Sequence, residues 1–263
     1  MTFLELSKTL FSAIFGLWAI KKALYRLGFR RRIARQKPPL SEKSRQARLE
    51  WATAHASWTP EQWKKILWTD ETWVKGGHHR RQYVTRRQGE EWDSTCIVER
   101  HQRKRRWMFW GCFHGSNKGP GLFWEKEWGK INQQTYCERI IPVINGWIRL
   151  RRQYGEELIL MQDGAPGHAA AATKADLQAR GIQIVSWPAY SPDLNPIEMC
   201  WNWMKDYIED NWGLEENPSY DKLRRYVREA WEALPESYLA ELLASMPERC
   251  KAVIEANGMH TKY

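Results

Sequence analysis

The chain has 263 residues, of which 43% are hydrophobic, so a disordered protein is excluded and a large domain with a packed core is expected. Lysine and arginine outnumber aspartate and glutamate by 41 to 31, which gives a net charge of +10. The five cysteines are scattered without a C-x-x-C pair, which argues against a disulfide framework or a zinc site. The basic charge is concentrated in residues 1–50, which suggests a nucleic-acid partner; a merely solvated basic surface is an equally good explanation of the charge alone.

The amino-terminal part of the chain is predicted to be helical and basic. An apolar stretch at residues 10–20 is too short to span a bilayer, so no membrane partner is expected. Residues 15–28 place their apolar side chains at helical spacing and stop at a glycine. Two further helix starts follow, with Ser41 and Thr59 as the capping residues.

The rest of the chain alternates strand and helix patterns. Strand patterns occupy residues 65–74, 81–86, 107–114, 121–124, 158–162 and 182–187. Helical periodicity occupies residues 132–154, 168–180, 196–211 and 220–256. This order predicts an α/β domain at residues 59–263, with a mixed sheet covered by helices on both faces and a helical carboxy-terminal tail. Residues 1–58 form the preceding basic helical segment.

Three acidic residues lie where ligands usually bind in such a domain. Asp70 and Asp163 each follow a run of apolar residues that is predicted to be a buried strand, and Glu198 opens a predicted helix. A charge in such a place is costly unless it is paired or bound to metal, and ligands of open α/β sheets bind beyond the strand ends. If the three carboxylates converge, they can hold two divalent cations, which stabilise both the attacking and the leaving oxygen of a phosphodiester exchange.

Each of these residues also has a purely structural explanation. Asp70 could begin a turn at a strand end, and Asp163 precedes a glycine in a pair that is common in strand-to-helix turns. Asn195 as the helix cap and Glu198 three positions later fit the spacing of a capping box. His168 could be a core or capping histidine, or it could orient Asp163 or a phosphate.

Several blocks of sequence together resemble the DNA transposases of the mariner superfamily. The three catalytic blocks are matched by Trp68-Thr69-Asp70-Glu71, Gln162-Asp163-Gly164-Ala165-Pro166-Gly167-His168 and Trp187-Pro188-Ala189-Tyr190-Ser191-Pro192-Asp193-Leu194-Asn195-Pro196-Ile197-Glu198. The central hairpin region of the family is matched by Trp110-Gly111-Cys112-Phe113 and Lys118-Gly119-Pro120-Gly121. The 34 residues between Asp163 and Glu198 are the spacing of the branch whose third acid is glutamate. The resemblance covers roughly residues 16–260 in order.

The resemblance implies a ribonuclease-H-like fold with a five-stranded mixed sheet, and cut-and-paste transposition. In that reaction, hydrolysis at the transposon ends is followed by attack of the freed 3′-hydroxyl on target DNA. Carried over by position, Asp70 would bridge two Mg²⁺ ions, which Mn²⁺ could replace, and Asp163 and Glu198 would each complete one site. The residues expected around these ligands are Glu71, His168 and Asn195. The resemblance further implies double-stranded DNA as the partner, a homodimer, a nuclear location and no small-molecule substrate.

The amino terminus departs from the family pattern, in which two helix-turn-helix units precede the catalytic domain. Only residues 16–35 resemble the last part of the second unit, so an amino-terminally truncated chain is expected. Its recognition helix would be Trp18–Leu27. The basic residues expected to contact DNA are Arg30, Arg31, Arg32 and Arg35 after this helix, and Arg103, Lys104, Arg105 and Arg106 between two strands. A solvated hairpin is the alternative for the second group.

Two other functions stay open at this point. One is a DNA-binding protein that derives from a transposase and has lost the chemistry, against which the presence of all three acids argues. The other is a different nuclease of the same fold, such as a ribonuclease H or a retroviral-type integrase. The Ser-Pro-Asp-Leu-Asn-Pro block and the lack of a His/Cys zinc module argue against the integrase.

Overall fold

A computed structural model describes most of the chain. The described residues are 17–30, 37–80, 85, 87–89, 93, 105–213 and 215–263. The chain divides into two compact units, Met1–Pro39 and Leu40–Tyr263, each of which is described by itself. The division lies before the helix that begins at Glu42, because that helix packs into the larger unit.

The smaller unit contains helix α2 (Leu17–Arg26), which ends as the sequence predicts. Gly28 adopts a left-handed conformation with φ of 85°. Its N–H donates to Tyr25 O at 3.1 Å, and the N–H of Phe29 donates to Leu24 O at 2.9 Å. These two bonds form a Schellman motif, for which glycine is the preferred residue because it has no Cβ.

Two capped helices open the larger unit, α3 (Glu42–His55) and α4 (Pro60–Lys64). Ser41 Oγ accepts a hydrogen bond from Ser44 N at 3.1 Å. Thr59 forms a capping box, in which its hydroxyl accepts from Gln62 N at 3.3 Å and its own N–H donates to Gln62 Oε1 at 2.8 Å. Both predicted caps are therefore confirmed.

The central sheet has four strands in the order β3-β2-β1-β4 among the described residues. The strands are β1 (Ile66–Lys75), β2 (Arg106–His114), β3 (Asn117–Phe123) and β4 (Ile159–Met161). β1 pairs antiparallel with β2 and parallel with β4, while β2 and β3 form an antiparallel hairpin. The prediction of a mixed sheet is confirmed.

The prediction of five strands is wrong for the described part of the chain. The segment 182–187 pairs with β4 only through one parallel bridge, between Leu160 and Ile184. Leu160 N donates to Gln183 O at 2.8 Å, and Val185 N donates to Leu160 O at 2.9 Å. One bridge does not make a ladder: residues 185–188 form no further bridge, and a turn follows at residues 189–190. The predicted strand at 81–86 lies outside the described residues apart from position 85.

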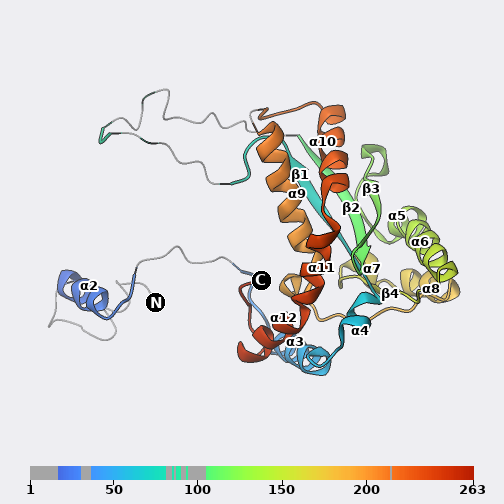
Figure 1. The fold of residues 1–263 in the computed structure, drawn as a ribbon, viewed down its shortest axis with the longest axis horizontal. Coiled ribbons are helices and arrows are strands. Elements are labelled where there is room, and N and C mark those ends of the chain that lie inside the picture. Colours follow the sequence, from blue (N-terminus) through green and yellow to red (C-terminus); the bar gives the residue numbers. More distant parts are fainter. Residues whose placement is uncertain are drawn as a thin grey trace. The chain divides into compact units, whose positions relative to one another are not determined.

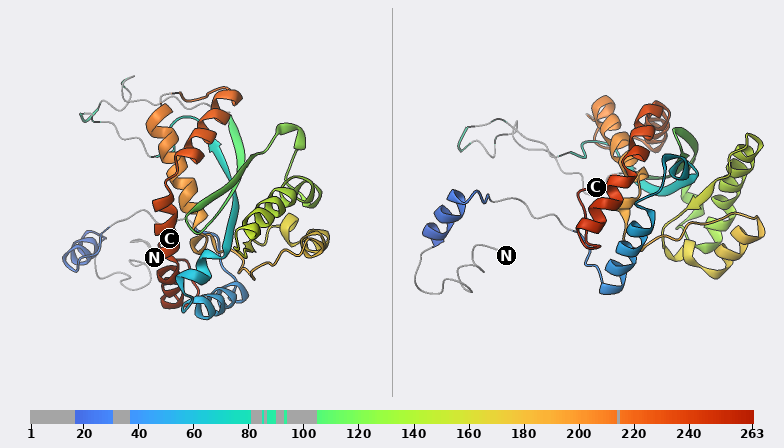
Figure 2. Two further views of the ribbon diagram at one scale, coloured as in Figure 1. Left: turned by 45° about the vertical axis from the view of Figure 1, so that its right-hand side comes forward. Right: turned by 60° about the horizontal axis from the view of Figure 1, so that its bottom comes forward.

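Helices cover both faces of this sheet. After the hairpin come η2 (Lys126–Trp128), α5 (Gln133–Arg139), α6 (Ile141–Gln153), α7 (Pro166–Ala169), α8 (Ala171–Ala179), η3 (Pro192–Leu194), α9 (Ile197–Trp212), α10 (Tyr220–Ala233), α11 (Glu236–Ala244) and α12 (Met246–Glu255). Figures 1 and 2 show α9, α10 and α11 on one face of the sheet and α5, α6 and α8 on the other. Each face has its own apolar core, so the larger unit has the three-layer arrangement that the sequence predicts.

Two predicted helices are each divided in the structure. The pattern at 132–154 gives α5 and α6, which meet at Ile140 just before Pro142. The pattern at 168–180 gives α7 and α8, which are separated by Ala170 in an extended conformation with ψ of 145°. None of the described helices is both long and apolar enough to cross a membrane.

Candidate active site

The register of two parallel strands brings Asp70 and Asp163 together. Trp68 of β1 pairs with Met161 of β4, and both side chains belong to the core on the α9 face of the sheet. Side chains two residues apart along a strand point to the same face. Asp70 and Asp163 each follow their paired residue by two positions, so their carboxylates emerge side by side where β4 ends. β1 continues to Lys75, so Asp70 lies within this strand and not at its end.

Close packing of α9 on the sheet brings Glu198 to the same place. Asp70 pairs with Gly111 on β2, and a Cβ built on Gly111 would lie only 3.0 Å from Cη2 of Trp201. The absence of a side chain at Gly111 therefore lets α9 approach β1 and β2. Trp201 lies one turn after Glu198 on the same side of the helix, so this contact places Glu198 opposite Asp70.

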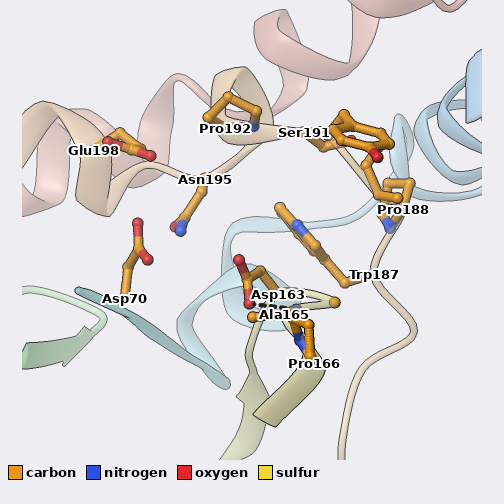
Figure 3. Close-up of a pocket in the computed structure, with 13 residues that line it drawn as sticks. Asp70, Asp163, Ala165, Pro166, Trp187, Pro188, Ser191, Pro192, Asn195 and Glu198 are labelled. Carbon is orange, nitrogen blue, oxygen red and sulfur yellow. Dashed lines mark hydrogen bonds between the residues drawn. The ribbon is translucent and has the colours of Figure 1, made fainter. Parts of the chain in front are cut away.

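The three carboxylates face one pocket of about 400 Å³. Figure 3 shows the side chains of Asp70, Asp163 and Glu198 directed into it from three separate elements, with the amide of Asn195 among them. Trp187 contributes an apolar wall. The side chain of Asp163 is 52% exposed, so the pocket is open to solvent.

Asp70 is largely buried and has three other carboxyl groups near it. Burial raises the pKa of Asp70 to about 8, and the nearby carboxylates of Glu198, Glu71 and Asp163 add to the effect. A hydrogen bond from Glu71 N to Asp70 Oδ1, at 2.8 Å, opposes the shift without cancelling it. Within the part of the chain that the structure describes, no three His, Cys, Asp or Glu side chains are grouped so that they could hold a single ion. Among the carboxylates that line the pocket, Glu198 and Asp163 both lie close enough to Asp70 to raise its pKa.

The chain's relatives identify the family. A family model described as DDE superfamily endonuclease matches residues 65–217, and a helix-turn-helix model described as Transposase matches residues 18–57. The chain is 31% identical to the Tcb1 transposase of Caenorhabditis briggsae and 31% identical to the Tc1 transposase of Caenorhabditis elegans, in each case over 93% of this chain and 87% of the relative. This chain belongs to the Tc1/mariner-type DDE transposases.

The fold agrees with that assignment. The structure is similar to crystal structures of the Mos1 mariner paired-end complex with Mn and with Mg, each with a TM-score of 0.76. The sequence identities are 20% and 19%, and each comparison covers 100% of this chain and 76% of the Mos1 chain. The ribonuclease-H-like fold expected from the sequence is therefore confirmed, as is the expected family.

His168 holds the carboxylate of Asp163 in place in this transposase. His168 is buried on α7, and its Nδ1–H donates to Asp163 Oδ1 at 2.6 Å. Its Nε2 lies 3.5 Å from Oε1 of Glu71, which alternates to the opposite face of β1 from Asp70. Burial lowers the pKa of His168, but the two carboxylates raise it further, to about 10. The imidazole is thus a cation between two acids.

The same contacts determine the charge of Asp163. Burial raises its pKa, but the hydrogen bonds from His168 and from Ala165 N, the latter at 2.9 Å, lower it below the ordinary value. Asp163 is therefore ionised at neutral pH and ready to bind a cation. Glu71 and His168 do not line the pocket, and their role in supporting the three carboxylates stays a prediction.

The capping box, which was the alternative explanation for Asn195 and Glu198, is absent at the start of α9. The helix begins at Ile197, and Pro196 holds the cap position without a capping side chain. Asn195 instead directs its amide into the pocket, and its Oδ1 accepts only a long hydrogen bond from Ile197 N at 3.4 Å. Glu198 lies in the first turn of the helix and lines the pocket. Asn195 is 5% exposed and lines the site with the three acids.

The basic residues expected to contact DNA are only partly described. Arg31, Arg32, Arg35, Arg103 and Lys104 lie outside the described residues. Arg30 is exposed and donates to Tyr25 O at the end of α2, at 2.7 Å. Arg105 donates from its N–H to Asn217 Oδ1 at 2.9 Å, and Arg106 lies over the ring of Trp73 at 4.7 Å. Their role in DNA binding stays a prediction.

Two features of the site were not predicted from the sequence. Lys205 lies two turns after Glu198 on α9. Burial lowers the pKa of Lys205, while the charges of Glu198 and Asp70 act to raise it. Its seven-residue spacing from Glu198 is a signal that could have found it. Arg48 supports the loop beside the pocket, through partners at least 142 residues away, which no local pattern reveals.

Proposed function

We propose that Asp70, Asp163 and Glu198 hold two Mg²⁺ ions with which this transposase hydrolyses DNA at transposon ends and then joins those ends to target DNA. The observation that carries the proposal is the convergence of three carboxylates, from β1, the end of β4 and the start of α9, on one open pocket. Asp70 would contact both ions, while Asp163 and Glu198 would each contact one.

The donor set fits such ions. All three ligands are carboxylate oxygens, which Mg²⁺ prefers, and Mg²⁺ in proteins commonly takes one or two carboxylates and completes its shell with water and substrate phosphate. The raised pKa of Asp70 marks a buried acid whose charge lacks enough compensation within the protein. Cations in the pocket would supply that compensation. Mos1 has been crystallised in complexes with Mg and with Mn, and this supports the use of divalent ions by the present chain.

The protein's own part in the reaction would be to hold the charged carboxylates in fixed positions around the pocket. Two bound ions would activate the attacking oxygen and stabilise the leaving oxygen of the phosphodiester. Asp163 is held in its ionised form by His168 and by the N–H of Ala165. Glu198 is fixed by the packing of α9 on the sheet at Gly111. These groups are ordered before substrate binds, so little reorganisation is needed when the reaction begins.

We extend the proposal to the partner molecules and the place of action. The substrate is double-stranded DNA, supported by the helix-turn-helix match and by the net charge of +10. A homodimer is supported by the paired-end complexes of Mos1, in which two ends are brought together. A nuclear location follows from the need to reach chromosomal DNA. Light scattering with the purified chain and imaging of a fluorescent fusion test the last two points.

A nicking assay tests the catalytic assignment. The variants Asp70→Asn, Asp163→Asn and Glu198→Gln keep the shape of each side chain and remove its charge, and each should lower Mg²⁺-dependent nicking of plasmid DNA roughly 100-fold or more. Asp176→Asn is the matched control, because Asp176 pairs with Arg180 on α8 and does not line the pocket. Equal nicking by the three variants and the control would refute the proposal. Binding of DNA by the wild type without any nicking would favour the alternative, a transposase-derived DNA-binding protein.

A further inference from the structure

A fully buried arginine lies behind one wall of the catalytic pocket. Arg48 of α3 is 0% exposed. All its hydrogen-bonding groups have partners, which are Gly258 O at 2.9 Å, Tyr190 O at 3.0 Å, Ser191 Oγ at 2.9 Å, Met259 O at 3.1 Å, and Asp193 Oδ1 and Oδ2 both at 2.7 Å. The two bonds to Asp193 form the bidentate pairing that arginine makes best with a carboxylate.

Asp193 is bound from two other directions as well. The N–H and the hydroxyl of Thr261 donate to Asp193 Oδ2, at 3.2 and 2.9 Å. Arg249 of α12 donates to the carbonyl of Asp193 at 2.8 Å. One residue of η3 is thus tied to α3, to α12 and to the segment 258–261. Gly258 is packed tightly at this junction, since a Cβ there would lie 2.2 Å from Arg45 O.

This junction lies next to the pocket without entering it. Ser191 and Asn195, on either side of Asp193, line the pocket, and Glu198 follows five residues after Asp193. Tyr190 also lines it, and its backbone has a φ of 57°, which is uncommon for a residue other than glycine. The carbonyl of Tyr190 accepts from Arg48, so the strained conformation is held from behind.

We propose that Arg48 is a positioning residue of the active site. Paired with Asp193, it fixes the loop Tyr190–Asn195 and, through this loop, the start of α9, where Glu198 faces Asp70. This inference rests on the proposed metal-binding role of Glu198. The helix-turn-helix model matches residues 18–57, and Arg48 lies near the end of that match. The inference therefore gives this part of the matched segment a function at the catalytic pocket.

The physical reason is that a buried ion pair contributes more to geometry than to net stability. Removing both charges from water costs about as much as their attraction returns, so an apolar pair of similar volume would often stabilise the fold equally well. A bidentate pair with further hydrogen bonds allows only one arrangement of the two backbones that carry it. Lysine in place of Arg48 keeps the charge but cannot make the two parallel bonds or reach all the carbonyls.

Hydrogen exchange of the metal-free protein tests the proposal directly. In Arg48→Lys and in Asp193→Asn, peptides covering residues 188–198 should exchange at least 10-fold faster than in the wild type. Peptides covering β4 and Asp163 should be unchanged. The matched control is Leu177→Ala, which opens a cavity in the core on the opposite face of the sheet and destabilises the unit without touching the loop. A uniform increase across all peptides in Arg48→Lys, as for the control, would overturn the positioning role, as would no change at 188–198.

Metal binding supplies the second readout. Titration with Mn²⁺, followed by the electron paramagnetic resonance of the free ion, should show that Arg48→Lys weakens binding of one ion by about 10- to 100-fold, as is usual when a residue behind a ligand is lost. Leu177→Ala should bind Mn²⁺ as the wild type does. If the wild type itself binds no Mn²⁺, the proposed function fails, and the exchange experiment still decides whether Arg48 holds the loop. If Arg48→Lys binds Mn²⁺ normally, the link to Glu198 is refuted.

Discussion

Replacing Gly111 by alanine should separate α9 from the sheet and misplace Glu198. A Cβ at this position would lie 3.0 Å from Trp201, 3.2 Å from Phe109 and 3.2 Å from Trp231, all of them ring atoms. Carbon atoms pack best at about 3.5–4.0 Å, so the rings have to move by about 0.5 Å. All three rings belong to the buried core, where such overpacking typically costs about 1–3 kcal/mol.

The change should be visible in both stability and activity. For a unit of this size, each kcal/mol shifts the unfolding temperature by roughly 2–4 °C, so a decrease of about 2–12 °C is expected in a calorimetric scan. Since a displacement of about 1 Å can lower an enzymatic rate 100-fold, the smaller shift here should lower Mg²⁺-dependent nicking by roughly 10-fold. Binding of DNA should be unchanged, because none of the atoms that a Cβ at Gly111 would meet belongs to a basic residue.

Gly146→Ala is the matched control for this experiment. Gly146 lies inside α6, and a Cβ there would meet nothing within 4 Å. Alanine at this site should therefore stabilise the helix by about 0.5–1 kcal/mol and leave nicking unchanged. If Gly111→Ala matches Gly146→Ala in unfolding temperature and in nicking, close packing at Gly111 is not what places Glu198.

Three further predictions concern charge and capping. In EDTA, the free energy of unfolding should fall as the pH rises from about 4 to about 8, because the folded-state pKa of Asp70 is about 8 and its ordinary value is 3.8. Urea titrations of Asp70→Asn should lack this loss. At pH 7 this variant should be about 2–4 kcal/mol more stable than the wild type. Glu209 should have the opposite effect. Burial raises the pKa of Glu209, but hydrogen bonds from Arg80 N and His78 lower it to about 2. Its contribution to the free energy of unfolding is therefore present above about pH 4.5 and is lost as the pH falls towards 2. Glu209→Gln should cost about 1–3 kcal/mol at pH 7 and flatten the acid limb of the stability curve, and an unchanged acid limb would contradict this assignment. Ser41→Ala should cost about 1 kcal/mol of unfolding free energy through the lost cap of α3, whereas no change in a thermal scan would show that the cap is not needed.

Local sequence patterns predicted the elements that carry the acids. The apolar runs before Asp70 and Asp163 are strands, and the apolar stripe of α9 is buried as its spacing predicts. Such patterns depend on nearest neighbours along the chain, which is why they suffice here. They could not give the parallel register of Trp68 with Met161, which alone places Asp70 beside Asp163.

The errors have the same origin, since they concern distant partners. The β-branched run at 182–187 has strand composition, but whether it forms a ladder depends on an edge that accepts only one bridge. For Asn195 and Glu198, the spacing left a capping box and a place in the site both open; the structure has no capping box there, and both residues line the pocket. The role of Arg48 depends on contacts with residues 142 to 211 positions further along the chain, so only the folded structure reveals it.

Crystals of the protein soaked in Mn²⁺ and measured at the manganese absorption edge test the central claim most directly. We expect two anomalous peaks in the pocket, about 3.5–4 Å apart, one between Asp70 and Asp163 and one between Asp70 and Glu198. The Asp70→Asn protein should show neither peak at full occupancy. Manganese bound elsewhere with the pocket empty, or bound equally well without the Asp70 carboxylate, would contradict the assignment of these three residues as the metal ligands.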